Sequence, residues 1–151
     1  MEFKKFEDII NFAIEKEREA VVFYEEAAEM QTAAGAKKMF MEFANEERKH
    51  EHMLKNIGEA DVSTYDFEWI PDIKRSNFLV DIPYEKNMAY KDMLHLAIKN
   101  EEKALALYND LLKNAEKPEF KNVFKMLCQE EANHKLKLET LFDDYMAQMG
   151  D

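Results

Sequence analysis

Six ionisable side chains lie on helical stripes that are otherwise apolar. They are Glu17, Glu47, His50, Glu101, Glu131 and His134. The apolar residues around them recur at alternating spacings of three and four, which is the pattern of helices that face a bundle core. Carboxylates and imidazoles buried in such a core are costly unless a counter-charge neutralises them. We therefore expect positively charged ions among these six side chains.

The residue types indicate which ions would suit such a site. Glu47 with His50, and Glu131 with His134, form two Glu-x-x-His pairs, and residues three apart share one helix face. Two divalent metal ions would supply four positive charges against the four carboxylates. Carboxylate and imidazole donors suit iron or manganese better than metals that prefer thiolates. The pattern therefore predicts a site for two metal ions held by four helices.

The second half of the chain repeats the first. The segment 13–24 resembles the segment 97–108, and each candidate ligand of the first half has a counterpart 84 positions later. The counterpart pairs are Glu17 with Glu101, Glu47 with Glu131, and His50 with His134. A lone Glu-x-x-His on a helix is usually a solvated pair or a satisfied core histidine. Here ionisable residues interrupt all four apolar stripes, and those of the second half lie 84 positions after those of the first. This coincidence favours a metal site instead.

Four long helices must position these residues. The chain has only 3 Gly and 3 Pro, so the long segments between them have no strong helix breaker. We expect an all-α fold, a four-helix bundle made of two repeated helical hairpins joined by a long crossover. The expected helices span about 6–31, 36–57, 88–114 and 119–149, with hairpins at 6–57 and 88–149 and a crossover at 59–87.

The crossover at 59–87 is too apolar for a flexible linker. Its apolar residues include Tyr65, Phe67, Trp69, Ile70 and Phe78. Two interpretations stay open: these side chains pack along the bundle, or they are buried against a second subunit. The second interpretation is the basis for expecting a homodimer.

The composition limits the function. With 151 residues, 46% apolar and 35% charged, the chain fits one globular domain over 1–151. A net charge of −11 would repel phosphate backbones and anionic lipids, so we expect no nucleic acid and no membrane partner. The single cysteine, Cys128, cannot form an internal disulfide or build a thiolate metal site alone. No apolar run matches a secretory signal or a membrane span, so we expect a cytoplasmic protein.

Other polar residues near the stripes have simpler interpretations. Glu46 and Glu130 each precede a candidate ligand, and we expect them to be surface or rim acids. His52 and His95 lie off the stripes, and we expect both to be exposed.

Small and aromatic residues follow the first candidate ligand of each hairpin. Ala20 and Ala104 lie one turn later, where a bulky side chain would crowd a metal site, although alanine is also a good helix former. Tyr24 and Tyr108 lie two turns later. Their hydroxyls either donate hydrogen bonds to the metal ligands or simply accompany rings that pack in the core.

At these residues the sequence resembles the rubrerythrin branch of the ferritin-like superfamily, in the short form that consists of the di-iron domain alone. The matching pieces are Ala-Ile-Glu-Lys-Glu-Arg-Glu-Ala with Phe-Tyr in 13–24, Glu-Glu-Arg-Lys-His at 46–50, Glu101 with Tyr108, and Glu-Glu-Ala-Asn-His at 130–134. The resemblance covers all four helices and implies a ferritin-like four-helix bundle.

The resemblance also implies a role for each ligand and a cofactor of two iron ions, with manganese or a mixed metal pair as the alternative. The bridging carboxylates would be Glu47 and Glu131, the terminal ones Glu17 and Glu101, and the nitrogen ligands His50 and His134. Catalysis would run through the metals that these six residues hold. Rubrerythrins reduce hydrogen peroxide or react with dioxygen, so a small oxidant is the expected substrate.

Two departures from the rubrerythrin pattern affect these expectations. The paired Cys-x-x-Cys motifs of a rubredoxin module are absent, so we expect electrons to come from a separate donor protein. Ala104 stands where rubrerythrins have an additional glutamate ligand. Two other functions stay open: iron binding with ferroxidase chemistry, and a metal-stabilised interaction protein that is not catalytic.

Overall fold

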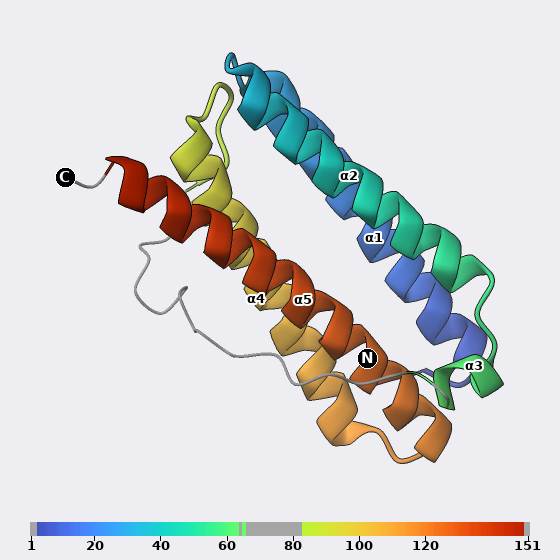
Figure 1. The fold of residues 1–151 in the computed structure, drawn as a ribbon. Helices are drawn as coiled ribbons and strands as arrows, with labels where there is room; N and C mark the ends of the chain where they lie inside the picture. The colour runs from blue at the N-terminus through green and yellow to red at the C-terminus, as the bar shows by residue number, and fades with distance from the viewer. Residues whose placement is uncertain (1–2, 64, 66–82, 150–151) are drawn as a thin grey trace. The chain divides into compact units, whose positions relative to one another are not determined.

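The computed structural model describes residues 3–63, 65 and 83–149, and the regular elements of this part are all α-helices (Figure 1). They are α1 (Phe6–Met30), α2 (Ala34–Lys55), α3 (Glu59–Ser63), α4 (Tyr90–Asn114) and α5 (Pro118–Met149). The predicted all-α fold is confirmed. Both ends of each long helix lie within two residues of the predicted positions, because few residues in these segments can break a helix.

The long helices pair into two hairpins, α1 with α2 and α4 with α5, and each hairpin forms a compact unit. The short helix α3 lies within the predicted crossover, where the sequence analysis predicts no helix. Its five residues are too few to show a helical period. The crossover residues Phe67, Trp69, Ile70 and Phe78 lie outside the described residues. None of the described helices has the length and apolar character needed to cross a bilayer.

The first hairpin buries the predicted apolar stripes of α1 and α2. Tyr24 is at its centre, 2% exposed, with its ring stacked on Phe43 at a centroid distance of 5.3 Å and on Phe40 at 6.5 Å. Small residues, Ala13 and Ala44 among them, are fully buried. Aromatic rings packed beside alanines let the two helices approach closely while the rings fill the space between them.

Side chains close the end of the first hairpin where α1 turns into α2. The Ala28 carbonyl near the end of α1 accepts the Gln31 N–H at 3.2 Å and a second hydrogen bond from the Lys37 ammonium at 3.3 Å. The buried Gln31 amide donates to the Met88 carbonyl at 3.2 Å, so the residues before α4 are tied to this hairpin. The turn therefore needs no glycine, and Gly35 lies within α2.

The second hairpin packs α4 against α5 around a core that is aliphatic as well as aromatic. Its buried residues include Leu94, Ile98, Tyr108, Phe124, Met126, Leu127 and Leu138. Helix α5 begins at Pro118, a position where proline is favoured because its missing N–H needs no partner in the first turn.

His95 is not exposed as expected but buried, with 8% of its surface accessible. The buried residues of α4 near its start form an arc wider than the predicted stripe, since Met93, Leu94, Ala97 and Ile98 are all fully buried around it. A residue beside the stripe is therefore also covered in this part of the helix. His52 is exposed, as expected.

Replacing Tyr24 with alanine should destabilise the metal-free protein strongly, because it removes a buried ring and leaves a cavity beside Phe43. We expect Tyr24→Ala to lower the free energy of unfolding by about 3 kcal/mol or more. Val22→Ala is the control, since Val22 is 52% exposed and should change that free energy by about 0.5 kcal/mol or less. Urea denaturation followed by circular dichroism measures both, and equal midpoints would contradict a structural role for the Tyr24 ring.

Candidate metal centre

Three of the predicted ligands come together in the second hairpin. Glu101 on α4 and Glu131 and His134 on α5 are buried, with 5%, 6% and 1% of their surfaces exposed. One potential ligand atom from each lies within 4.8 Å of the other two. The His134 Nδ1 atom lies 3.8 Å from a carboxylate oxygen of Glu101 and 3.8 Å from one of Glu131.

The spacing of these donor atoms fits a shared metal ion. A separation of 3.8 Å is too long for a direct hydrogen bond between imidazole and carboxylate. Metal bonds to nitrogen and oxygen are about 2.0–2.2 Å long, so two donors on one ion are separated by up to about 4.3 Å. Two carboxylates and one imidazole also form a donor set that suits iron or manganese. The residues present in this hairpin therefore fit the metal that the sequence predicts.

The helix period explains why these three side chains meet. Glu131 and His134 are three residues apart on α5, with the buried Leu127 and Leu138 one turn before and after them. On α4, Glu101 lies one turn after the buried Ala97. Each ligand thus occupies a position that the hairpin would otherwise fill with an apolar residue.

The first hairpin buries the counterpart residues. Glu17 on α1 is 3% exposed and Glu47 on α2 is 1% exposed, while His50 is half-buried. Ligand atoms of Glu47 and His50 lie within 4.8 Å of each other, as expected for residues three apart on one helix face. All four predicted carboxylate ligands of the chain are therefore buried. A buried carboxylate needs a neutralising partner or a proton, and a metal ion is one such partner.

The other polar residues singled out in the sequence are two glutamates and two tyrosines, which do not belong to the cluster of donor atoms. Glu46 and Glu130 are both half-buried, and Glu130 accepts a hydrogen bond from the Tyr65 hydroxyl. Tyr108 is buried like Tyr24, with 1% of its surface exposed. The ring contacts of Tyr24 show that it packs in the core, whereas a hydrogen bond from either tyrosine to a metal ligand stays a prediction.

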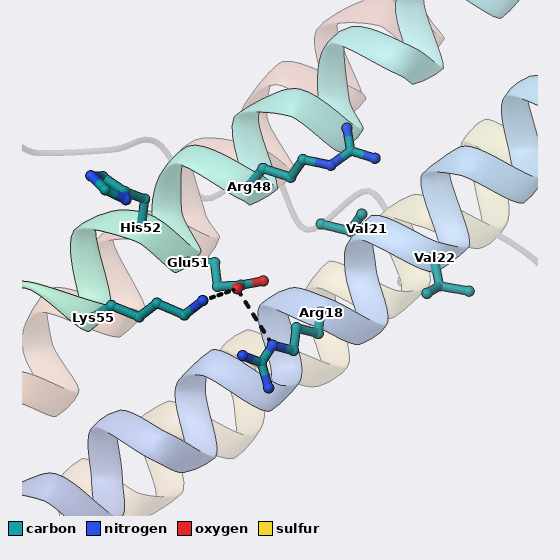
Figure 2. Close-up of a pocket in the computed structure, with 7 residues that line it drawn as sticks. All are labelled: Arg18, Val21, Val22, Arg48, Glu51, His52 and Lys55. Atoms are coloured by element: carbon teal, nitrogen blue, oxygen red, sulfur yellow. Dashed lines mark ion pairs between the residues drawn. The ribbon is translucent and has the colours of Figure 1, made fainter.

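A groove of about 500 Å³ runs along the surface of the first hairpin and holds none of the predicted ligands (Figure 2). Its lining residues are Arg18, Val21, Val22, Arg48, Glu51, His52 and Lys55. The groove is lined by exposed cations rather than by buried carboxylates. We therefore do not assign the metal site to it.

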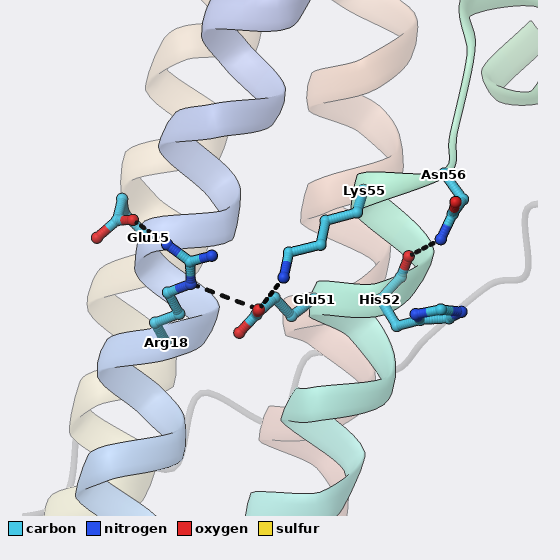
Figure 3. Close-up of polar contacts among 6 residues, drawn as sticks. All are labelled: Glu15, Arg18, Glu51, His52, Lys55 and Asn56. Atoms are coloured by element: carbon cyan, nitrogen blue, oxygen red, sulfur yellow. Dashed lines mark hydrogen bonds and ion pairs between the residues drawn. The ribbon is translucent and has the colours of Figure 1, made fainter.

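Three charged residues of this groove, Arg18, Glu51 and Lys55, form an ion-pair network between α1 and α2 (Figure 3). The Glu51 carboxylate lies 2.8 Å from the Lys55 ammonium and 3.4 Å from the Arg18 guanidinium, which also contacts Glu15 at 2.7 Å. The hydrogen bond from Lys55 and the charges of Lys55 and Arg18 lower the pKa of Glu51. The hydrogen bond to Glu15 and the charge of Glu51 raise the pKa of Arg18. Both shifts favour the charged forms of Glu51 and Arg18.

The sequence analysis misses two buried charged residues, Lys135 and Glu139, which are 2% and 1% exposed. Lys135 directly follows the predicted ligand His134 and pairs with Glu102 at 2.8 Å. A signal for them was present in the repeat, because Lys135 and Glu139 lie 84 positions after Glu51 and Lys55. Charged residues are usually exposed, so the residue types at these two positions do not predict that they are buried.

Comparison with known families identifies the class of protein. A family model described as a ferritin-like domain matches residues 6–143, a range that includes both hairpins and all six predicted ligands. The chain therefore belongs to the ferritin-like domain family, which confirms the predicted superfamily. Comparisons with curated proteins and with solved structures gave no match.

The Cys128 thiol should be unreactive at neutral pH. It is partly buried on α5 and donates a hydrogen bond to the Asn109 amide oxygen at 3.4 Å, and burial raises its pKa to about 11. Because the thiolate is the nucleophile, we expect the rate of alkylation by iodoacetamide to rise about tenfold per pH unit between pH 7 and 10. A rate that levels off near pH 8.5, the ordinary thiol value, would contradict this effect of burial.

Proposed function

We propose that this chain is a rubrerythrin-like, non-haem di-iron oxidoreductase that reduces hydrogen peroxide or reacts with dioxygen. The observation that carries this proposal is the buried cluster of Glu101, Glu131 and His134, together with its counterpart residues in the first hairpin. The ferritin-like family match agrees with a metal-binding role. We treat residues 1–151 as one domain, since both hairpins contribute ligands.

Each hairpin would supply the same set of donors. Glu47 and Glu131 would bridge the two iron ions, while the other four residues would each bind one ion, as the resemblance to rubrerythrins implies. The terminal ligands are Glu17, His50, Glu101 and His134. Manganese or a mixed pair would suit the same donors. Tyr24 and Tyr108 would orient ligand carboxylates by hydrogen bonds from their buried hydroxyls.

When bound, two ferrous ions supply one electron each, so that one hydrogen peroxide molecule and two protons become two water molecules. The chain's own residues hold the ions, exclude bulk water and keep the site compact. Ala20 and Ala104 lie one turn after Glu17 and Glu101, and their small side chains leave room for a small oxidant. Ala104 has only a methyl group and cannot act as a ligand, so the proposed ligand set has no seventh carboxylate at that position.

The proposed cycle needs a source of electrons, and we propose a separate electron-donor protein. We also propose a homodimer, and expect neither nucleic acid nor membrane as a partner. A storage function would instead require a large oligomeric shell, and a purely structural metal would not be oxidised rapidly. Native mass and oxidation kinetics therefore distinguish the proposed enzyme from both alternatives.

Metal titration tests the ligand assignment. We expect the wild-type chain to bind two Fe²⁺ ions under anaerobic conditions, and Glu131→Ala or Glu47→Ala to lose both, because a bridging carboxylate is shared. Glu17→Ala should mainly weaken one ion. Glu46→Ala is the matched control, a half-buried glutamate beside Glu47 that should retain both ions. Saturation of the wild type at one ion per chain would overturn the two-metal assignment.

Oxidation kinetics test the reaction itself. We expect the anaerobic, iron-loaded chain to be oxidised by one equivalent of hydrogen peroxide per two irons within seconds, as followed by the rise of ferric absorbance. Cys128→Ser should react equally fast, since a thiol with a pKa of about 11 is protonated at neutral pH. Faster oxidation by dioxygen in a shell of many subunits would favour a ferroxidase. Oxidation no faster than that of free iron would favour a non-catalytic role.

A further inference from the structure

The second hairpin contains a charged triad beside its predicted ligands. The Lys135 ammonium on α5 lies 2.8 Å from a carboxylate oxygen of Glu102 on α4 and 3.9 Å from one of Glu139, one turn further along α5. The side chains of Lys135 and Glu139 are 3% and 1% exposed, and that of Glu102 is 32% exposed. A buried ammonium is retained only when carboxylates compensate it, so this triad fixes α4 relative to α5.

The first hairpin contains the same triad with every sign reversed. Arg18, Glu51 and Lys55 lie 84 positions before Glu102, Lys135 and Glu139. Glu51 pairs across the hairpin with Arg18 at 3.4 Å and along α2 with Lys55 at 2.8 Å. The repeat has therefore kept the attraction between the two helices while changing all three residues that provide it.

Both interhelical pairs directly follow predicted ligands in the chain. Arg18 follows Glu17 and Glu51 follows His50, and in the second hairpin Glu102 follows Glu101 and Lys135 follows His134. Consecutive residues on an α-helix are about 100° apart around its axis. Each pair therefore joins the two helices of its hairpin at the height of the ligands, beside the face that carries them.

A second interhelical ion pair shows that this arrangement is not general to the repeat. Arg48 on α2, which directly follows Glu47, pairs with Glu25 on α1, which lies two turns after Glu17 and does not follow a predicted ligand. Its counterparts in the second hairpin are Ala132 and Asn109, which cannot form an ion pair. Of these interhelical pairs, the one in which both residues directly follow predicted ligands is present in both hairpins.

We propose that Glu102 with Lys135, and Arg18 with Glu51, are positioning pairs for the metal ligands. Each pair sets the rotation and spacing of its two helices at the ligand turn, and so sets the distance between the ligand carboxylate on one helix and the histidine on the other. Neither pair binds the metal. This role rests on the proposed metal centre, and it predicts that loss of one charge changes metal binding rather than only the folding stability.

Cobalt binding provides the test, since the visible spectrum of bound Co²⁺ reports ligand geometry without any turnover. We expect Glu102→Gln and Glu51→Gln each to weaken Co²⁺ binding about tenfold or more by calorimetry, the scale seen when a residue that orients a metal ligand is lost. We also expect both variants to shift the visible absorption bands. Glu25→Gln, which breaks the Arg48 pair, is the matched control and should change affinity less than twofold.

A charge-swapped variant separates positioning from a loss of fold. Glu102→Arg combined with Lys135→Glu and Glu139→Lys gives the second hairpin the sign pattern of the first. We expect this triple variant to bind Co²⁺ more tightly than Glu102→Gln and with a spectrum closer to the wild type. Circular dichroism confirms that each variant retains its helices before the metal is added.

The possible results distinguish this role from the proposed function. Variants that melt at a lower temperature but bind Co²⁺ with wild-type affinity and spectrum would overturn the positioning role alone. An effect of Glu25→Gln as large as that of Glu51→Gln would also overturn it. A wild-type chain that binds neither Co²⁺ nor Fe²⁺ would overturn the metal centre itself, and the positioning role with it.

Discussion

The burial of four carboxylates is the constraint on which the rest of this structure depends. Glu17, Glu47, Glu101 and Glu131 are each 6% exposed or less, although burying a single uncompensated charge is among the most costly changes in a protein. Apolar packing does not lower this cost, because buried alanines and aromatic rings keep water away and offer a carboxylate no compensating charge. A stable fold with such an interior is best explained by ions that these carboxylates are arranged to bind.

The repeat shows how this constraint is met twice in one chain. Each hairpin offers one lone carboxylate and one Glu-x-x-His pair, and the cluster in the second hairpin has donor spacings that suit one ion. The hairpins differ outside the ligand set: Phe43, whose ring stacks on Tyr24, has the buried Leu127 as its counterpart in the second hairpin. Packing has therefore been free to diverge where ligand positions have not.

The sequence predicts the helices well, because they depend on period and residue type, and it places the four candidate carboxylates on faces that are buried. Their role as metal ligands stays a prediction. The sequence predicts neighbours across a hairpin poorly. His95 is buried because the covered arc of α4 is wider than its stripe, a width that depends on tertiary packing. Lys135 and Glu139 escape prediction for a similar reason, since a charged residue is assumed to face solvent unless its partner on another helix is known. The helix α3 is too short for any periodic signal.

The reversed signs of the two triads have a consequence for which helices can pair. A chimeric hairpin of α1 and α5 would bring Arg18 against Lys135, and one of α4 and α2 would bring Glu102 against Glu51, so each would set like charges at the contact. The metal ligands would not oppose such an exchange, because either combination supplies one carboxylate and one Glu-x-x-His pair. Electrostatic repulsion beside the predicted ligands thus favours the pairing of each helix with its own neighbour, although both halves carry the same candidate ligands.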